Sequence, residues 1–218
     1  MGLLKSSIAR KVTMSLSGLF LIVFLLQHLI INLMSVVSPD SFNEVSHFMG
    51  TNGLIQFVMQ PILIIGVVLH FVMGFIIESQ NRKARPIKYG EFKSSSNSSF
   101  ASRNMAISGL VILAFLAVHM VDFFFPEISY KYVQFLPEDP TRYYPHTVAA
   151  FASPIRTFGY VIAFGLLGMH LWHGFSSAFQ SIGFNNKYSK ALEKCTKAYA
   201  VLVPLGFIFI ALYHFLNQ

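Results

Sequence analysis

The chain has 218 residues, of which 54% belong to the set AVILMFWYC and only 11% are charged. This composition is too apolar for a soluble domain, and it excludes a disordered chain and a water-soluble nucleotide-binding enzyme. The single cysteine, Cys195, excludes a disulfide-stabilised secreted scaffold. The 16 Lys and Arg residues exceed the 9 Asp and Glu residues, so the placement of the basic residues must be known before they are interpreted.

Five stretches carry no formal charge over 18 residues or more, and each is long enough to cross a bilayer as a helix. Runs such as LFLIVFLL are apolar at every position, whereas the strands of a membrane barrel would alternate. The sequence therefore predicts an all-α membrane protein with a single membrane domain over residues 1–218 and no internal repeat. The helices are expected at about 14–37, 54–77, 104–125, 155–180 and 198–216.

Basic residues concentrate on one side of these helices. Thirteen of them fall on the side of the N-terminus, namely Lys5, Arg10, Lys11, Arg82, Lys83, Arg85, Lys88, Lys93, Arg103, Lys187, Lys190, Lys194 and Lys197. Only Lys131, Arg142 and Arg156 fall on the other side. Because cytoplasmic loops are rich in Lys and Arg, this predicts a cytoplasmic N-terminus and an outer C-terminus. The basic excess then reflects topology, contact with anionic lipid or a docked soluble partner, and no nucleic acid is expected.

Four predicted helices each carry a histidine well inside the span: His28, His70, His119 and His170. At ~1.5 Å per residue, His28 and His119 lie ~21–23 Å above the inner surface. His70 and His170 lie ~22–24 Å below the outer surface, so they share a second level. Ionisable side chains in a membrane face a partner, a cavity or a metal.

Two histidine pairs at two depths are the ligands that two bis-histidine b-type haems require. The chain has no C-x-x-C-H motif, so a haem would be held noncovalently. Gly66 and Gly74 lie at i−4 and i+4 from His70, and Gly174 lies at i+4 from His170, which leaves room for a porphyrin beside the inner pair. The spacing leaves a second interpretation open, namely a bundle that conducts protons or ions.

The other histidines have less defined roles. His173, at i+3 from His170, is a candidate for contacting a haem propionate or a quinone, or for replacing His170 as ligand. His47 and His146 fall in predicted outer loops, as surface residues or members of a quinone pocket, and His214 lies near the outer end of its helix.

The chain resembles a known family over nearly its whole length. The family is the single-chain, five-helix, dihaem cytochrome b subunit of succinate dehydrogenase and fumarate reductase (respiratory complex II), and the form is most similar to that of Bacteroidetes-type complexes. The matching segments are SLSGLFLIVFLLQHL at 15–29, LHFVMG at 69–74, NRKARPIKYG at 81–90, SSFASRNM at 98–105, AVHM at 117–120 and GMHLWHGFSSAFQSIGFN at 168–185.

The resemblance implies that His28 and His119 hold the iron of an outer haem b, and that His70 and His170 hold the iron of an inner haem b. Its H-x-x-x-G pattern on the fourth helix falls on His170 and Gly174, which favours His170 over His173. The propionate candidates are Ser15, Arg103 and His173, the glycines packed on haem are Gly74 and Gly174, and the quinone candidates are Glu44 and His47, with Gln56 and Gln60 nearby.

The resemblance further implies an oxidoreductase subunit in a bacterial inner membrane. It would anchor a flavoprotein subunit and an iron-sulfur subunit and pass electrons between the iron-sulfur clusters and menaquinone or another quinone. FAD and the clusters belong to those partners, because one cysteine cannot hold a cluster. Some relatives use a transmembrane proton path through a glutamate two residues before the fourth-helix histidine; here that position is Gly168, so this path is not expected.

Two other functions remain as alternatives at this point. One is the dihaem cytochrome b subunit of a different quinone-linked dehydrogenase. The other is a histidine-dependent proton or ion transporter that binds no haem.

Overall fold

The computed structural model describes residues 6–83, 105–184 and 186–218. Every regular element within these ranges is a helix. Five helical segments are long and apolar enough to cross a membrane, namely Ser7–Val37, Ile55–Lys83, Met105–Val133, Pro154–Ser181 and Ser189–Leu216. The prediction of an all-α, multi-pass membrane protein is therefore confirmed for the described part of the chain.

The first span is longer than predicted because a helix does not end where its sequence stops being apolar. Helix α1 (Ser7–Val37) begins seven residues before the predicted start. Its 31 residues extend ~46 Å, which exceeds the ~30 Å hydrocarbon layer of a bilayer. Pro39 then begins the unpredicted helix α2 (Pro39–Thr51). Its N-cap residue, Ser38, accepts a hydrogen bond from the Ser41 backbone N–H.

The third span continues past its predicted end near residue 125. Helix α6 (Met105–His119) leads into the π-helical turn η3 (Met120–Phe124), then α7 (Phe125–Ile128) and a second π turn, η4 (Ser129–Val133). Pro126, which has no N–H to donate, lies inside this continuous helical run. A π turn therefore follows His119 directly, and such turns are frequent at functional sites.

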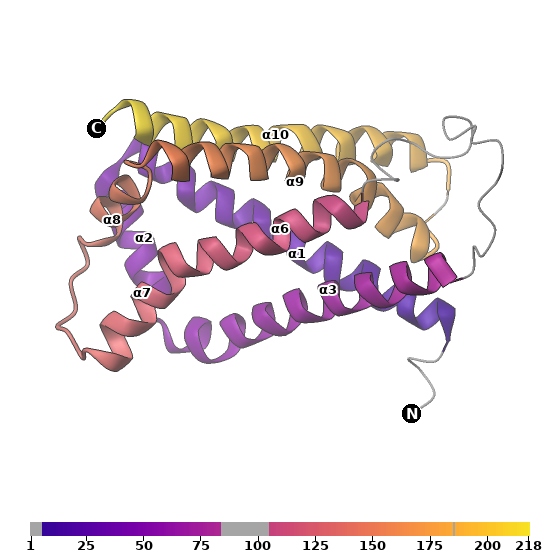
Figure 1. The fold of residues 1–218 in the computed structure, drawn as a ribbon, viewed down its shortest axis with the longest axis horizontal. Coiled ribbons are helices and arrows are strands. Elements are labelled where there is room, and N and C mark those ends of the chain that lie inside the picture. The colour runs from indigo at the N-terminus through magenta and orange to yellow at the C-terminus, as the bar shows by residue number, and fades with distance from the viewer. Residues whose placement is uncertain (1–5, 84–104, 185) are drawn as a thin grey trace.

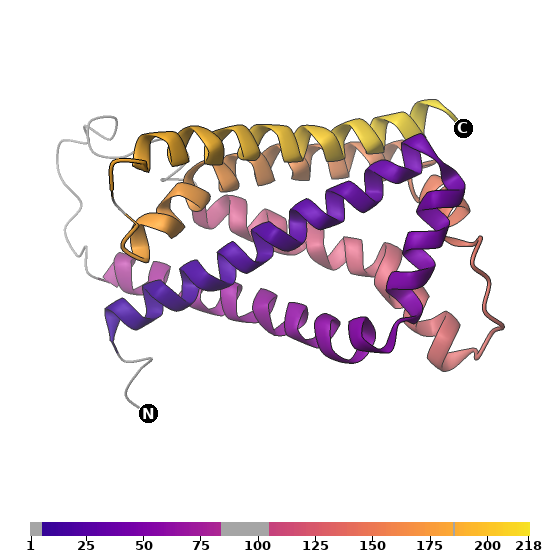
Figure 2. The same cartoon turned by 180° about the vertical axis from the view of Figure 1, so that it is seen from behind.

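The last two long helices, α9 (Pro154–Ser181) and α10 (Ser189–Leu216), lie side by side along one edge of the molecule (Figure 1). Helix α1 crosses behind them, as the reverse view shows (Figure 2). Helix α3 (Gln60–Lys83), which continues the π turn η2 (Ile55–Met59), packs on α1. Helix α6 packs on α9 and touches α3, so that α1, α3, α6 and α9 form a four-helix bundle with α10 outside it.

The two ends of this bundle are named here by the chain termini. The N-terminal end is where α1 begins, and the C-terminal end is where α10 ends, together with α2 and the short helix α8 (Tyr143–Ala150) (Figure 1). Most of the buried apolar core lies between α1, α9 and α10. It consists of Leu29, Phe151, Tyr160, Phe164, Val203, Phe207, Ile210 and Ala211.

Gly168 has a packing role at the contact between α9 and α10. Pro204 lacks an N–H, so the carbonyl of Ala200, four residues earlier, has no helical donor there. A Cβ at position 168 would lie 3.2 Å from that oxygen. The glycine therefore lets the two helices approach closely.

Candidate functional site

The four intramembrane histidines meet in two pairs. The rings of His28 and His119 have their centroids 5.8 Å apart with planes at 89°. The rings of His70 and His170 have their centroids 6.3 Å apart with planes at 73°. These are the partners that the estimated depths predicted. In each pair the two rings come from diagonally opposed helices of the four-helix bundle, α1 with α6 and α3 with α9.

Each ring of the His70–His170 pair contacts a serine on a neighbouring helix. The Oγ of Ser17 on α1 lies 3.3 Å from Nδ1 of His70, and this hydroxyl donates to the Met14 carbonyl at 2.9 Å. The Oγ of Ser108 on α6 lies 3.2 Å from Nδ1 of His170. That hydroxyl donates to the Met105 carbonyl at 3.0 Å. Both histidines therefore have a serine hydroxyl beside Nδ1.

These contacts define the tautomer of both histidines. A serine hydroxyl has one proton, and in Ser17 and Ser108 it is directed at a helix carbonyl. The serine oxygen can then only accept from the imidazole, so the proton lies on Nδ1. Each Nε2 is left with a free lone pair, which is the form in which histidine binds a metal.

Two glycines that the sequence analysis did not name lie against the rings of this pair. A Cβ at Gly18 would lie 3.2 Å from Cε1 of His70, and a Cβ at Gly109 would lie 3.7 Å from Cε1 of His170. The predicted haem-packing glycines face methionine methyl groups instead, Gly74 that of Met14 at 3.6 Å and Gly174 that of Met105 at 3.5 Å. Gly66 faces the ring of Phe20.

The His28–His119 pair has different surroundings. The amide nitrogen of Asn32 donates to the His28 carbonyl at 2.8 Å and lies 3.4 Å from His28 Nδ1. An NH₂ group can only donate, so this contact favours a proton on Nε2 of His28. The Nδ1 of His119 is buried and has no hydrogen-bond partner. Aromatic rings provide the remaining contacts, with Phe24 stacked on His28 at 5.4 Å and Phe115 against His119 at 5.9 Å.

The predicted propionate candidates lie apart from these ring contacts. Ser15 is buried in α1, but the serine that touches a histidine is Ser17, two residues later. His173 is half-buried, and Ser177 lies 3.4 Å from its Nε2. Arg103 lies outside the described residues.

A cavity of about 250 Å³ opens at the C-terminal end of the bundle. His47 and Gln56, both named from the sequence, line it together with Thr51, Tyr130, Lys131, Tyr132, Leu136, Glu138, Asp139, Arg142 and Tyr143. Glu44, the other quinone candidate, is exposed and does not line it. The cavity is thus bounded mainly by polar and aromatic side chains from α2, η2, η4, the segment that leads to α8 and the first residue of α8.

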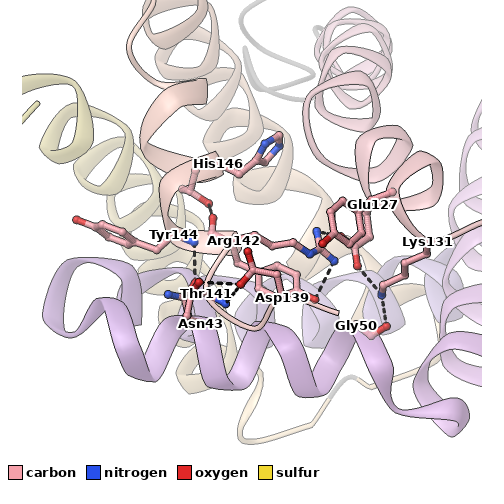
Figure 3. Close-up of polar contacts among 12 residues, drawn as sticks. Asn43, Gly50, Glu127, Lys131, Asp139, Thr141, Arg142, Tyr144 and His146 are labelled. Atoms are coloured by element: carbon pink, nitrogen blue, oxygen red, sulfur yellow. Dashed lines mark hydrogen bonds and ion pairs between the residues drawn. The ribbon is translucent and has the colours of Figure 1, made fainter. Parts of the chain in front are cut away.

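Ion pairs hold the walls of this cavity together (Figure 3). Glu127 pairs with both Lys131 and Arg142, and Lys131 donates to the carbonyl of Gly50 on α2. A Cβ at Gly50 would lie 3.0 Å from the Tyr143 hydroxyl, so a larger residue there would displace this side chain by a few tenths of an ångström. Burial, reinforced by the charge of Glu127, raises the pKa of Tyr143 to about 12, so its hydroxyl stays protonated at neutral pH and can donate into the cavity.

A second polar network, which the sequence did not predict, lies beside the His28–His119 pair. Asp122 follows His119 by less than one turn, and its carboxylate binds Arg156 at 2.6 Å and accepts from the Tyr160 hydroxyl at 2.7 Å. Nε2 of His146 lies 2.8 Å from the Asp122 carbonyl. Tyr160 also packs on the His119 ring at 6.2 Å. The carboxylate is only 8% exposed, so its partners compensate for its burial.

The donor set fits a haem better than a bare metal ion. Within the described residues, no group of three or more His, Cys, Asp or Glu side chains could hold a metal, whereas a bare zinc ion takes three or four protein ligands. Haem iron needs only two axial ligands. Imidazoles on opposite sides of one metal, at about 2 Å from metal to nitrogen plus ~1.1 Å from nitrogen to ring centre, have centres about 6 Å apart. Both observed pairs have that spacing.

Comparisons of the chain with models of protein families, with curated proteins and with solved structures found no match. Ser17, Ser108, Gly18 and Gly109 are the site residues that the sequence analysis missed. One feature could have identified them: the pattern Met-x-x-Ser-Gly begins at residue 14 and again at residue 105, and a histidine follows each methionine by 14 residues. The expectation of no internal repeat was wrong.

Proposed function

We propose that this chain is a membrane-bound dihaem cytochrome b, and that it is the quinone-reactive anchor subunit of a succinate:quinone oxidoreductase or quinol:fumarate reductase. The observation that carries the cytochrome proposal is the meeting of four histidines from four helices in two ring contacts of 5.8 and 6.3 Å. The assignment to this particular complex rests on the sequence resemblance.

His70 and His170 would hold the inner haem through Nε2. A bound haem supplies a one-electron iron couple. The residues of the chain fix the two rings: Ser17 and Ser108 keep the proton on Nδ1, so that both lone pairs remain available. Both imidazoles are then neutral, which suits an apolar membrane interior.

His28 and His119 would hold the outer haem. The buried, unpartnered Nδ1 of His119 supports a ligand at this level, because buried polar atoms without a partner are rare. Ligation by Nε2 of His28 requires the proton to move to Nδ1, and then the Asn32 amide must turn its oxygen toward it. Ring spacing, depth and the unpartnered nitrogen of His119 therefore support this pair, and its hydrogen bonds do not.

The N-terminal end of the bundle would face the cytoplasm of a bacterial inner membrane. The three basic residues assigned to the opposite side support this orientation, because each of them is paired with a carboxylate: Lys131 and Arg142 with Glu127, and Arg156 with Asp122. The C-terminal end thus has little uncompensated positive charge, as an outer face should.

The basic cytoplasmic segments 81–103 and 187–197 would dock the iron-sulfur subunit, which in turn carries the FAD-containing flavoprotein. Residues 84–104 and 185 lie outside the described part of the chain, so this docking surface is proposed from its charge. Exchanging Lys187 and Lys190 for Glu is expected to release the soluble subunits while the chain still inserts in the membrane. Full retention of both subunits would contradict this docking surface.

The cavity at the C-terminal end would bind the quinone headgroup, and the resemblance favours menaquinone. His47, Gln56 and the protonated Tyr143 hydroxyl offer hydrogen bonds of the kind a quinone carbonyl accepts. We expect His47→Ala to raise the KM for quinol roughly tenfold, the loss of about 1.4 kcal/mol from one hydrogen bond, with haem content unchanged. Glu44→Gln, outside the cavity, is the matched control.

A dithionite-reduced minus oxidised absorbance spectrum of the detergent-purified complex, with haem quantified per chain, tests the cytochrome proposal. Two b-type haems per chain are expected. One haem would restrict the proposal to His70 and His170, and none would overturn it in favour of a transporter. A different quinone-linked dehydrogenase would be recognised by the soluble subunits that co-purify.

A further inference from the structure

The four-helix bundle contains an internal repeat. Segments 14–28 and 105–119 align without a gap and are identical at seven positions: Met14 with Met105, Ser17 with Ser108, Gly18 with Gly109, Leu19 with Leu110, Phe24 with Phe115, Leu25 with Leu116, and His28 with His119. The helices that follow in each half share the pattern His-x-x-x-Gly-Phe, at residues 70–75 and 170–175.

The repeated residues make repeated contacts. In the first half, Ser17 and Gly18 lie against His70 while the methyl of Met14 lies against Gly74. In the second half, Ser108 and Gly109 lie against His170, and the methyl of Met105 lies against Gly174. Apolar helices can share leucines by composition alone. A shared set of contacts around two histidines cannot arise in that way.

Helices α1 and α6 both start at the N-terminal end, and α3 and α9 both start at the C-terminal end. The two halves are therefore parallel repeats, related by a rotation about an axis along the bundle. His70 corresponds to His170, and His28 to His119. Each histidine pair thus consists of two equivalent residues facing each other across that axis.

The repeat is exact at one pair and broken at the other. Ser17 and Gly18 of α1, which lie against the His70 ring, have the identical counterparts Ser108 and Gly109 of α6 at His170. Beside the other pair, Asn32 at i+4 from His28 corresponds to Phe123 at i+4 from His119. The serine contact is therefore present in both halves, whereas the Asn32 contact beside His28 has no counterpart beside His119.

We propose that Ser17 and Ser108 are a duplicated pair of positioning residues that hold His70 and His170 as Nδ1-protonated ligands of one and the same haem. The proposal rests on the dihaem function proposed above. Each hydroxyl anchors itself on its own helix carbonyl and accepts the imidazole proton, so the ring can neither shift its proton to Nε2 nor rotate without losing a hydrogen bond. The two serines act from opposite halves on a single cofactor.

Loss of the hydroxyl has two measurable consequences. An imidazole whose N–H has a good acceptor is a more basic ligand, and outer contacts of this kind change metal affinity about 10- to 100-fold. Without the acceptor, the ligand donates less electron density to the iron, so the midpoint potential of the inner haem shifts upward. Haem is also lost more easily in detergent.

The test compares threonine with valine at positions 17 and 108 of the intact complex. These two side chains have nearly the same shape and differ in the hydroxyl, and threonine in a helix can bond the same carbonyl. Ser17→Thr and Ser108→Thr should keep the inner haem and its potential close to those of the parent. Ser17→Val and Ser108→Val should both raise the potential of that haem and speed its release about 10- to 100-fold.

Ser35→Ala is the matched control outside the two pairs. Ser35 donates to the Asn32 carbonyl at 2.6 Å and lies 2.8 Å from Nε2 of His214, which belongs to neither pair. The same kind of serine–histidine bond is therefore removed away from His70 and His170, so the potential and the release rate of the inner haem should match those of the parent.

Each outcome decides the inference. Valine variants that match threonine variants in haem content and potential would overturn it while leaving the two-haem function intact. The inference would also be overturned if Ser17→Val and Ser108→Val changed different haems, because the repeat assigns both serines to the inner haem. A parent protein without haem would instead overturn the proposed function, before any variant is compared.

Discussion

The His70–His170 pair and the His28–His119 pair lie on the same four helices, yet their side chains are held in different ways. At the first pair, two serines and two helix carbonyls orient the rings through hydrogen bonds. At the second, aromatic rings surround both imidazoles and one ring nitrogen has no partner. Similar ring spacing therefore does not give equal preorganisation, because only at the first pair do serines on neighbouring helices fix the protons of both rings.

The largest expected effect comes from removing one histidine of the His70–His170 pair. We expect His70→Ala or His170→Ala to abolish the inner haem and quinone-linked electron transfer, because one axial ligand does not hold a b-type haem in this site. Succinate oxidation with a soluble acceptor should survive in the flavoprotein. Haem per chain and the reduced-minus-oxidised spectrum measure the loss, with His214→Gln as the control. A variant with full haem content would refute the assignment.

A smaller loss is expected at the other pair. His28→Ala or His119→Ala should remove the outer haem only, leaving about one haem per chain. The serines that contact His70 and His170 lie on the same helices as His28 and His119, but about three turns away from them. The same spectrum, with redox titration to separate the two components, checks this. Loss of both haems from either variant would show that the two levels are not independent.

A larger side chain beside the His70 ring tests how tightly the His70–His170 pair is packed. A Cβ at Gly18 would lie 3.2 Å from His70 Cε1, closer than an ordinary contact, so Gly18→Ala should displace the ring by a few tenths of an ångström. We expect partial loss of the inner haem on detergent washing and an unchanged outer haem. Gly165→Ala, where a Cβ meets nothing within 4 Å, should behave like the parent.

The smallest effect is expected from the polar network beside the second pair. Asp122→Asn keeps the shape but removes the charge that Arg156 and Tyr160 share. Leaving these donors poorly paired should cost about 1–3 kcal/mol of stability, measured as a lower Tm of the detergent-solubilised protein. Because Tyr160 packs on His119, only the outer haem spectrum should change. A change confined to the inner haem would contradict the placement of this network.

Hydropathy and the depth of four histidines predicted much of the architecture. Charge-free segments give the five spans because unpaired charge is costly in hydrocarbon, and antiparallel helices convert sequence distance into depth. The same reasoning failed at the helix ends. Residues 7–13 and 126–133 continue their helices beyond the apolar segment. Helix α2 is too polar, and α8 too short, for hydropathy to find.

The supporting contacts could be predicted only in part. His47 and Gln56 were named from the sequence and line the same cavity, but its Lys131, Arg142 and Tyr143 come from segments more than 70 residues away in the chain. Ser17 could have been found by comparing the two halves of the sequence, because its counterpart Ser108 lies in a matching pattern. The partners of Asp122 have no such pattern, so no property of the sequence alone identifies them.

The sequence by itself determined the helical class, the number of spans and the levels of the histidines, because each of these depends on local composition and on a fixed rise per residue. Only the tertiary structure decided which hydroxyl meets which ring, that Gly18 rather than Gly74 lies against His70, and that Glu127 joins α2 to α8 through Lys131 and Arg142. Those contacts depend on the rotation of each helix about its own axis. That rotation is set by packing between helices distant in the chain, and local composition does not encode it.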